Sequence, residues 1–200
     1  MFKKYWKFFV IFWSVVLVGI IGVFVFFWLI SAGKLGFMPT FEELENPNNR
    51  FASEVYFADG PIMNRYFEKE NRKYIEYREI PQSVIDALIA TEDVRFYDHS
   101  GVDVRGLFRV AKGLLTANTS AGGGSTISQQ LAKMLFPRES DLNVFELAIR
   151  KFREWVIAVR LEKSYTKEEI LTMYLNKYDF LNLAVGISSA ADIYFQVPLD

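Results

Sequence analysis

The chain has 200 residues, of which 51% are hydrophobic and 24% charged, and it contains no cysteine. This composition excludes an intrinsically disordered protein, and the lack of cysteine excludes a disulfide-stabilised miniprotein and a thiol nucleophile. The net charge of −1 gives no overall excess of positive charge, so we expect no nucleic-acid partner.

A long apolar segment follows the first seven residues. No charged side chain occurs between 8 and 33, and at about 1.5 Å per residue a helix of this length exceeds the ~30 Å hydrocarbon core of a bilayer. A cleaved signal peptide has a shorter apolar region, so we favour an uncleaved transmembrane anchor. Three lysines precede the segment and Lys34 follows it. This asymmetry predicts a cytoplasmic tail at 1–7 and an external location for the rest of the chain.

The part after the anchor divides into a linker and a helical domain. Residues 34–80 contain turn-forming residues and three short β-like stretches, at 51–58, 62–67 and 74–80. From Pro81 onward the apolar residues recur at helical spacing, which predicts a mostly α-helical domain over 81–200. Thr166 and Glu169 form a capping box that starts one helix. The expected helices cover 81–92, 103–117, 125–136, 143–164, 167–178 and 183–195.

The first candidate site is the acidic stretch at the end of the helix 81–92. Glu92, Asp93, Asp98 and Asp103 lie close in sequence to His99, which is the only histidine. Neighbouring carboxylates perturb one another's ionisation, so one of them can act as a general base near neutral pH. An ordinary acidic helix end is the alternative. With no second histidine or cysteine nearby, the sequence predicts no zinc site here.

The second candidate is the helix after the glycine run 122–124. Thr126, Gln130 and Lys133 fall on one polar stripe at positions i, i+4 and i+7. Free N–H groups at the helix start and the lysine farther along suit a phosphate or pyrophosphate. A glycine linker, an N-cap and a solvated helix face together form the alternative. The glycines do not match a Walker loop, so a nucleotide is not indicated.

The third candidate is the helix 143–164, which carries Arg150, Lys151 and Glu154 away from its expected apolar stripe. Basic residues there can face an anionic substrate, whereas an exposed Arg150–Glu154 ion pair is the ordinary alternative. Ser164 and Lys167 match the Ser-x-x-Lys pattern of acyl-serine enzymes, but its companion motifs are missing. The expected apolar stripe consists of Ile149, Phe152, Val156 and Val159.

Taken in chain order, these stretches resemble the peptidoglycan glycosyltransferase domain, the family-51 glycosyltransferases of class A penicillin-binding proteins and monofunctional transglycosylases. The resemblance covers about 80–195 and rests on five motifs in the family's order. The second motif is GGSTISQQLAK, in which Ser128 replaces a threonine, and the fourth and fifth are KEEILTMYLN and GISSAADIYF. The first motif contains Glu92, Asp93, Phe96, His99, Gly101 and Asp103, and the third contains Arg150, Lys151 and Glu154.

The resemblance implies a lysozyme-like fold and the polymerisation of lipid II into β-1,4-linked glycan strands at the outer face of the cytoplasmic membrane. Glu92 would be the general base, and Glu154 would assist the undecaprenyl pyrophosphate side, directly or through Mg²⁺ or Mn²⁺. The partners implied are lipid II, the growing glycan strand, the membrane and other cell-wall synthesis proteins. The substrate-binding residues implied are Asp93, Phe96, His99, Ser125, Thr126, Gln129, Gln130, Lys133, Arg150 and Lys151.

Two departures from the family pattern affect these expectations. The segment 177–186 reads KYDFLNLAVG where the family has an aromatic-rich stretch with glycine, so we expect a differently shaped cleft there. Family members continue beyond the position of Asp200, so we expect the chain to be a fragment of a longer protein. A membrane-anchored muramidase-like hydrolase and a non-catalytic envelope scaffold are the alternative functions.

Overall fold

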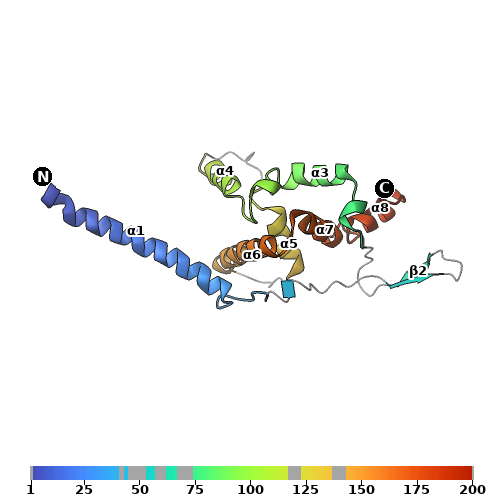
Figure 1. The fold of residues 1–200 in the computed structure, drawn as a ribbon, viewed down its shortest axis with the longest axis horizontal. Helices are drawn as coiled ribbons and strands as arrows, with labels where there is room; N and C mark the ends of the chain where they lie inside the picture. The colour runs from blue at the N-terminus through green and yellow to red at the C-terminus, as the bar shows by residue number, and fades with distance from the viewer. Residues whose placement is uncertain are drawn as a thin grey trace. The chain divides into compact units, whose positions relative to one another are not determined.

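The computed structural model describes residues 2–40, 43–44, 53–56, 62–66, 74–116, 123–136 and 143–199, and these are mostly helical (Figure 1). The chain forms two compact units, one of residues 1–38 and 141–156, the other of residues 39–140 and 157–200.

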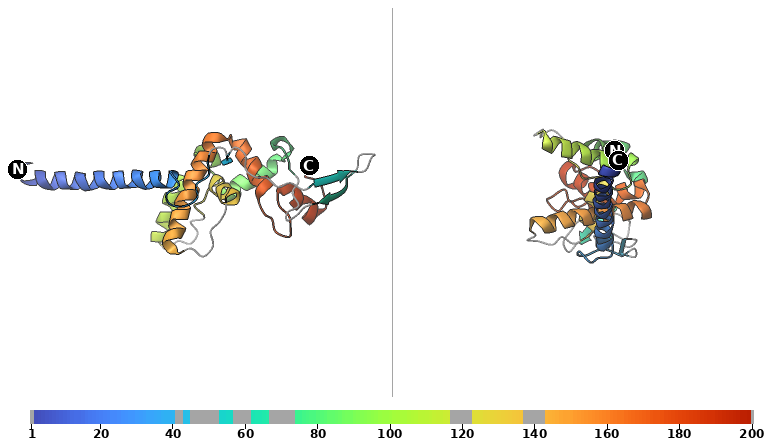
Figure 2. Two further views of the ribbon diagram at one scale, coloured as in Figure 1. Left: turned by 90° about the horizontal axis from the view of Figure 1, so that it is seen from below. Right: turned by 90° about the vertical axis from the view of Figure 1, so that its left-hand side faces the viewer.

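The first unit contains helix α1 (Phe2–Ser31), a continuous helix seen side-on in Figure 2. Its stretch Tyr5–Ser31 has a mean hydropathy of 2.8, and within the described residues it is the one helix that is long and apolar enough to cross a membrane. The expected long apolar helix is therefore confirmed. Near its end, the rings of Phe26 and Phe27 pack edge-on against Phe152, with centroids 5.3 and 5.7 Å away. Phe152 belongs to helix α6 (Val144–Ser164).

The second unit begins with a short antiparallel pair, β1 (Ser53–Tyr56) and β2 (Ile62–Tyr66), within two of the stretches expected to be β-like. The third expectation, at 74–80, was wrong. These residues include a 3₁₀ helix, η1 (Tyr77–Glu79), because the Glu79 carboxylate accepts the N–H of Glu76 at 2.6 Å and closes a tight turn.

Within the second unit, helix α7 (Lys167–Lys177) contacts η1, α5 (Ile127–Leu135) and α8 (Ile187–Phe195). The capping box of Thr166 and Glu169 at the start of α7 is confirmed. Farther along α7, the Asn176 side chain accepts the Ile75 N–H at 3.0 Å and donates to the Ile75 carbonyl at 2.9 Å. The other elements of this unit are α3 (Gln82–Glu92), η2 (Phe96–Asp98) and α4 (Val104–Leu115).

The last helix, α8, begins at Ile187 rather than at residue 183 as expected. Its N-cap is Gly186, with φ +88, a conformation that favours glycine over any residue with a Cβ. The Gly186 N–H donates to the Tyr178 carbonyl at 2.9 Å. These contacts hold residues 181–183 in a left-handed turn, so the apolar pattern there does not continue as a helix.

The buried face of α6 also differs from the expected apolar stripe, whose four residues are only half-buried. Ile157, Ala158 and Leu161 are buried instead. Gly101, with φ +95, explains part of this difference, because a Cβ at its position would lie 2.7 Å from the Ala158 carbonyl carbon. The close approach of this loop selects a helix face that the count of apolar residues alone does not reveal.

Candidate active site

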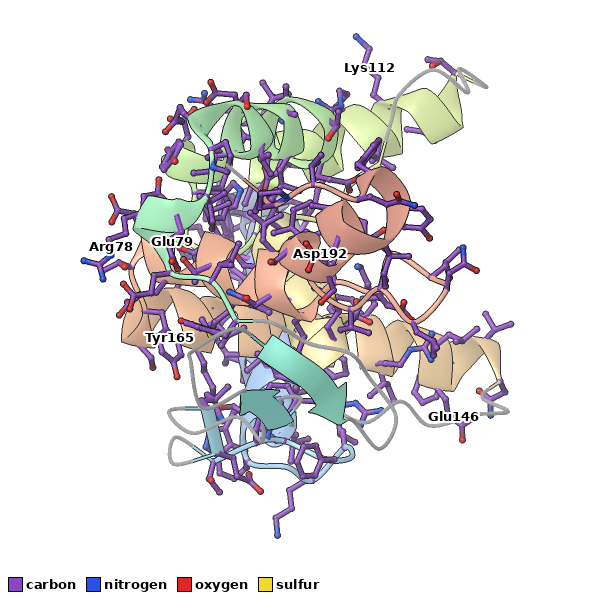
Figure 3. All side chains as sticks on the ribbon, turned by 90° about the vertical axis from the view of Figure 1, so that its right-hand side faces the viewer. Arg78, Glu79, Lys112, Glu146, Tyr165 and Asp192 are labelled. Atoms are coloured by element: carbon purple, nitrogen blue, oxygen red, sulfur yellow. The ribbon has the colours of Figure 1, made fainter. Side chains whose placement is uncertain are left out.

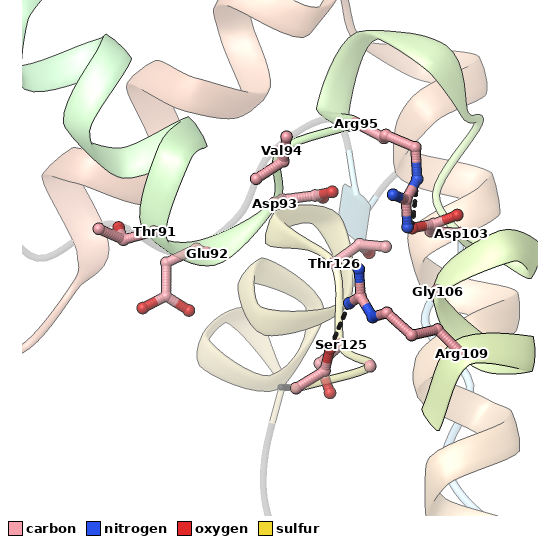
Figure 4. Close-up of a pocket in the computed structure, with 12 residues that line it drawn as sticks. Thr91, Glu92, Asp93, Val94, Arg95, Asp103, Gly106, Arg109, Ser125 and Thr126 are labelled. Atoms are coloured by element: carbon pink, nitrogen blue, oxygen red, sulfur yellow. Dashed lines mark hydrogen bonds and ion pairs between the residues drawn. The ribbon is translucent and has the colours of Figure 1, made fainter. Parts of the chain in front are cut away.

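A cleft of about 330 Å³ lies between the end of α3, the start of α4 and the turn before α5 (Figure 4). Its lining includes Glu92 and Asp93 from the first motif and Ser125 and Thr126 from the second. Residues from two sequence motifs that are about thirty residues apart therefore line one cleft.

Glu92 is the last residue of α3 and is exposed at the edge of the cleft. Its Oε2 accepts a hydrogen bond from Nε2 of Gln130 at 2.7 Å, and Oε1 of Gln130 accepts one from the Tyr174 hydroxyl at 3.0 Å. Oε1 of Glu92 accepts no hydrogen bond from the described residues. One oxygen of this carboxylate is thus held in place while the other is available to a substrate hydroxyl.

Asp93 follows immediately but points in a different direction (Figure 4). It is buried, and its Oδ2 accepts the N–H of Ile127 at 3.0 Å and lies 3.0 Å from Nε2 of His99. Nδ1 of His99 accepts the Gly101 N–H at 3.2 Å, so the ring proton is on Nε2 and is donated to Asp93. Asp93 therefore uses its carboxylate to join two loops.

The start of α5 is built from buried polar side chains. Thr126 is the N-cap, and its hydroxyl accepts the Gln129 N–H at 3.2 Å and donates to the Gly101 carbonyl at 2.7 Å. Gln129 is fully buried and donates to the same carbonyl at 3.3 Å. Ser125 and Lys133 are half-buried and more accessible. Of the polar residues expected on this helix, Ser125 and Lys133 are therefore better placed for direct contact with a ligand than Thr126 and Gln129, whereas the Gln130 amide is engaged by Tyr174 and Glu92.

Phe96 lies in the core next to a half-buried charge pair. Nζ of Lys167 is 4.2 Å from the centroid of the Phe96 ring, donates to the His99 carbonyl at 2.7 Å and pairs with Glu162 at 2.8 Å. Ser128 also donates its hydroxyl to Glu162. These contacts favour a role for Phe96 and His99 in holding the loop over direct contact with a substrate.

Sequence reasoning assigned no role to two arginines that line the cleft, Arg95 and Arg109. Arg95 donates to Oδ2 of Asp103 through Nε at 3.1 Å, and Arg109 donates to the Gly123 carbonyl at 3.2 Å. Burial alone would raise the pKa of Asp103, but the Arg95 guanidinium and the Gly106 N–H together hold it below its ordinary value. Their positions in the sequence could have indicated them, because Arg95 lies inside the first motif and Arg109 follows shortly after it.

The third motif lies on α6, in the part of this helix that belongs to the first unit. Glu154 is buried and pairs with Lys151, with Nζ 3.0 Å from Oε2, rather than with Arg150 as considered from the sequence. Among the described residues, no three acidic, histidine or cysteine side chains come together to hold a metal ion.

Known proteins share this sequence pattern. A family model described as transglycosylase matches residues 59–200. Penicillin-binding protein 1A of Escherichia coli K12 is 38% identical over 163 residues, which is 82% of this chain and 18% of that protein. The protein of the same name from Pseudomonas aeruginosa PAO1 is 38% identical over 162 residues, 81% of this chain and 19% of that protein.

The chain thus spans less than a fifth of the length of these relatives. The family match covers more than two thirds of the chain and includes all five motifs. The resemblance inferred from those motifs is confirmed, and the chain belongs to the transglycosylase family.

Proposed function

We propose that this protein is a peptidoglycan glycosyltransferase with a lysozyme-like fold that polymerises lipid II into glycan strands. The 4-hydroxyl of the acceptor lipid II attacks the anomeric carbon of the growing strand, and the bond from that carbon to undecaprenyl pyrophosphate breaks. The hydroxyl proton passes to Glu92, and the anomeric centre inverts to give a β-1,4 link. Membership of the transglycosylase family supports this reaction class.

The observation that carries the proposal is the geometry of Glu92. A general base needs a carboxylate oxygen that a substrate hydroxyl can reach, and such a base contributes about 10²–10⁴-fold to the rate. Glu92 lines the cleft with Oε2 held by Gln130 and with Oε1 available. Asp93 is a poor candidate for the base because its carboxylate already accepts hydrogen bonds inside the protein.

The leaving group is a pyrophosphate, which needs cationic partners more than an acid because it carries its own negative charge. Following the family resemblance, we assign this role to Lys133 and Arg150, with Glu154 assisting directly or through a substrate-bound Mg²⁺ or Mn²⁺. Lys133 has no hydrogen-bond or ion-pair partner among the described residues, which leaves its ammonium available to a phosphate.

A location at the outer face of the cytoplasmic membrane, with residues 1–7 on the cytoplasmic side, completes the proposal. The apolar helix α1 and the lysines that precede its apolar stretch support it. So does α4, where Val104, Phe108 and Leu115 form one apolar stripe and are 58%, 73% and 89% exposed. Lys112 extends from the same helix into solvent (Figure 3). An exposed apolar stripe beside basic side chains is typical of a helix that lies at a lipid surface.

The test is polymerisation of purified lipid II by the intact protein in detergent, followed by gel analysis of the glycan product. We expect the wild-type protein to make polymer and Glu92→Gln to lose at least a hundredfold in rate, about the contribution of a general base. Asp86→Asn is the matched control, since Asp86 is an exposed carboxylate on the same helix.

Two outcomes would contradict the proposal. Polymerisation retained by Glu92→Gln, with an unchanged circular dichroism spectrum, would exclude Glu92 as the base. Release of soluble sugar fragments from finished peptidoglycan, without consumption of lipid II, would instead indicate the muramidase-like hydrolase.

A further inference from the structure

Three side chains from three different helices form a continuous path to the cleft. The hydroxyl of Tyr174 on α7 lies 3.0 Å from Oε1 of Gln130 on α5, and Nε2 of Gln130 lies 2.7 Å from Oε2 of Glu92 on α3. Tyr174 itself is buried, with 3% of its surface exposed, and is not among the residues that line the cleft. The path thus connects the core to the carboxylate at the cleft edge.

Both hydrogen bonds of this path are donated in the same direction, from Tyr174 to Gln130 and from Gln130 to Glu92. Burial, with a further contribution from the Glu92 charge, raises the pKa of Tyr174 above its ordinary value of 10.0. The phenol therefore keeps its proton at neutral pH and can donate it to the amide oxygen of Gln130. With its oxygen engaged by Tyr174, the Gln130 amide presents its N–H₂ group to Glu92.

The opposite orientation of the amide would have a chemical consequence. Oε1 of Gln130 would then face a carboxylate oxygen of Glu92, and two acceptors repel each other unless Glu92 carries a proton. A protonated Glu92 cannot accept a proton from a sugar hydroxyl. The amide orientation in which Gln130 accepts the Tyr174 hydroxyl is therefore the one that pairs with an ionised Glu92.

We propose that Tyr174 is a positioning residue, which acts through Gln130 to hold Glu92 as an oriented carboxylate ready for proton transfer. This inference rests on the proposed function, in which Glu92 is the general base. Tyr174 touches no substrate in this role. Its hydroxyl, and not its ring, is the group that matters for catalysis.

A purely structural role for Tyr174 is the competing explanation, and the neighbouring Tyr178 provides the control. The two rings are stacked, with centroids 5.4 Å apart and an interplanar angle of 28°. Within the described residues, the Tyr178 hydroxyl makes no hydrogen bond. Tyr174→Phe and Tyr178→Phe each remove one hydroxyl from the same stack, but only the first breaks the path to Glu92.

The experiment measures lipid II polymerisation by the intact protein with each variant. We expect Tyr174→Phe to lower kcat about tenfold, a part of the full contribution of a general base, and to leave KM within about twofold. Tyr178→Phe is expected to keep the wild-type kcat. Equal kcat values for Tyr174→Phe and wild type would overturn the inference while leaving the proposed function intact. A wild-type protein that makes no polymer would overturn the proposed function and this role with it.

A double-mutant cycle with Gln130→Met distinguishes the effect of losing the hydrogen-bonded path from the effect of disturbing side-chain packing. Methionine has nearly the size of glutamine but no amide, so this variant breaks the path without removing the tyrosine. If Tyr174 acts through Gln130, adding Tyr174→Phe to Gln130→Met lowers kcat no further. An additional tenfold loss in the double variant would overturn the inference. If Tyr174→Phe does not fold, the kcat of Gln130→Met is the test of the inference. A wild-type kcat in Gln130→Met would overturn it.

Discussion

The carboxylate of Asp93 accepts the backbone N–H of Ile127, at 3.0 Å, across 34 residues of sequence. Ile127 is the first residue of α5, where backbone N–H groups have no partner within the helix. A carboxylate at this position satisfies one of those donors and interacts favourably with the positive end of the helix dipole. Asp93 thereby ties the end of α3 to the start of α5, and so fixes the two sides of the cleft relative to each other.

Replacing Asp93 with alanine should therefore destabilise the protein. The change leaves the Ile127 N–H and the Nε2–H of His99 buried without an acceptor, which costs about 2–4 kcal/mol. Asp93→Asn keeps one oxygen acceptor and should cost less. Thermal unfolding of both variants in detergent, followed by circular dichroism, measures the difference. A melting temperature for Asp93→Ala equal to that of the wild type would contradict the assigned role.

Thr126 offers a second test, because its hydroxyl both caps α5 and bonds the Gly101 carbonyl. Thr126→Val keeps the shape of the side chain but removes the hydroxyl, and we expect a loss of about 1–2 kcal/mol in the free energy of unfolding. Thr126→Ser retains the cap and should remain close to the wild type. If Thr126→Val and Thr126→Ser unfold at the same temperature, the cap contributes nothing to stability.

The pair of Arg95 and Asp103 predicts a dependence on pH. Because the pKa of Asp103 is held below its ordinary value of 3.8 in the folded protein, the native state binds this proton less tightly than the unfolded chain. The stabilisation is present above pH 3.8 and is lost as the pH falls through the folded pKa. We expect the difference in melting temperature between wild type and Asp103→Asn to shrink from pH 6 toward pH 3. A difference that grows on acidification would contradict this assignment.

The apolar stripe on α4 predicts contact with lipid. Because the chain contains no cysteine, a single cysteine can be labelled specifically with an environment-sensitive fluorophore. We expect a label at Leu115→Cys to shift to the blue when the intact protein is moved from detergent into anionic nanodiscs and to be quenched by brominated lipids. A label at Glu168→Cys, an exposed site on α7, is the control. Quenching that is equal at the two sites would argue against a specific role for α4.

Several elements were predictable from the sequence because they depend on neighbours within one helical turn. The bounds of α3, α6 and α7 follow the apolar spacing to within about two residues, and the capping box of Thr166 and Glu169 forms as expected. The apolar character of α1 needs no tertiary context, since it rests on composition and length alone. The motifs and their order were likewise sufficient to indicate the family.

Other elements depended on contacts that are remote in sequence. The start of α8 is set by Gly186 and its bond to Tyr178, and the buried face of α6 is set by the approach of Gly101 to Ala158. The 3₁₀ turn at Tyr77–Glu79 replaced an expected strand because a side-chain cap outweighed a loose alternation of apolar residues. Local periodicity carries no information about such partners.

In the candidate site, two adjacent residues show the same difference between what the local sequence predicts and what remote contacts decide. The amino-acid pattern alone indicates that Glu92 and Asp93 belong to one motif at a helix end and that a helix with a polar stripe follows the glycines. Only the tertiary structure separated their roles, because the backbone of Asp93 leaves the helix at φ −157 and ψ 73 and turns the two side chains apart. Asp93 then meets the start of α5 and is buried, whereas Glu92 meets Gln130 at the cleft edge. Two carboxylates of equal chemistry thus become a structural acceptor and a candidate base through the long-range partners that each one finds.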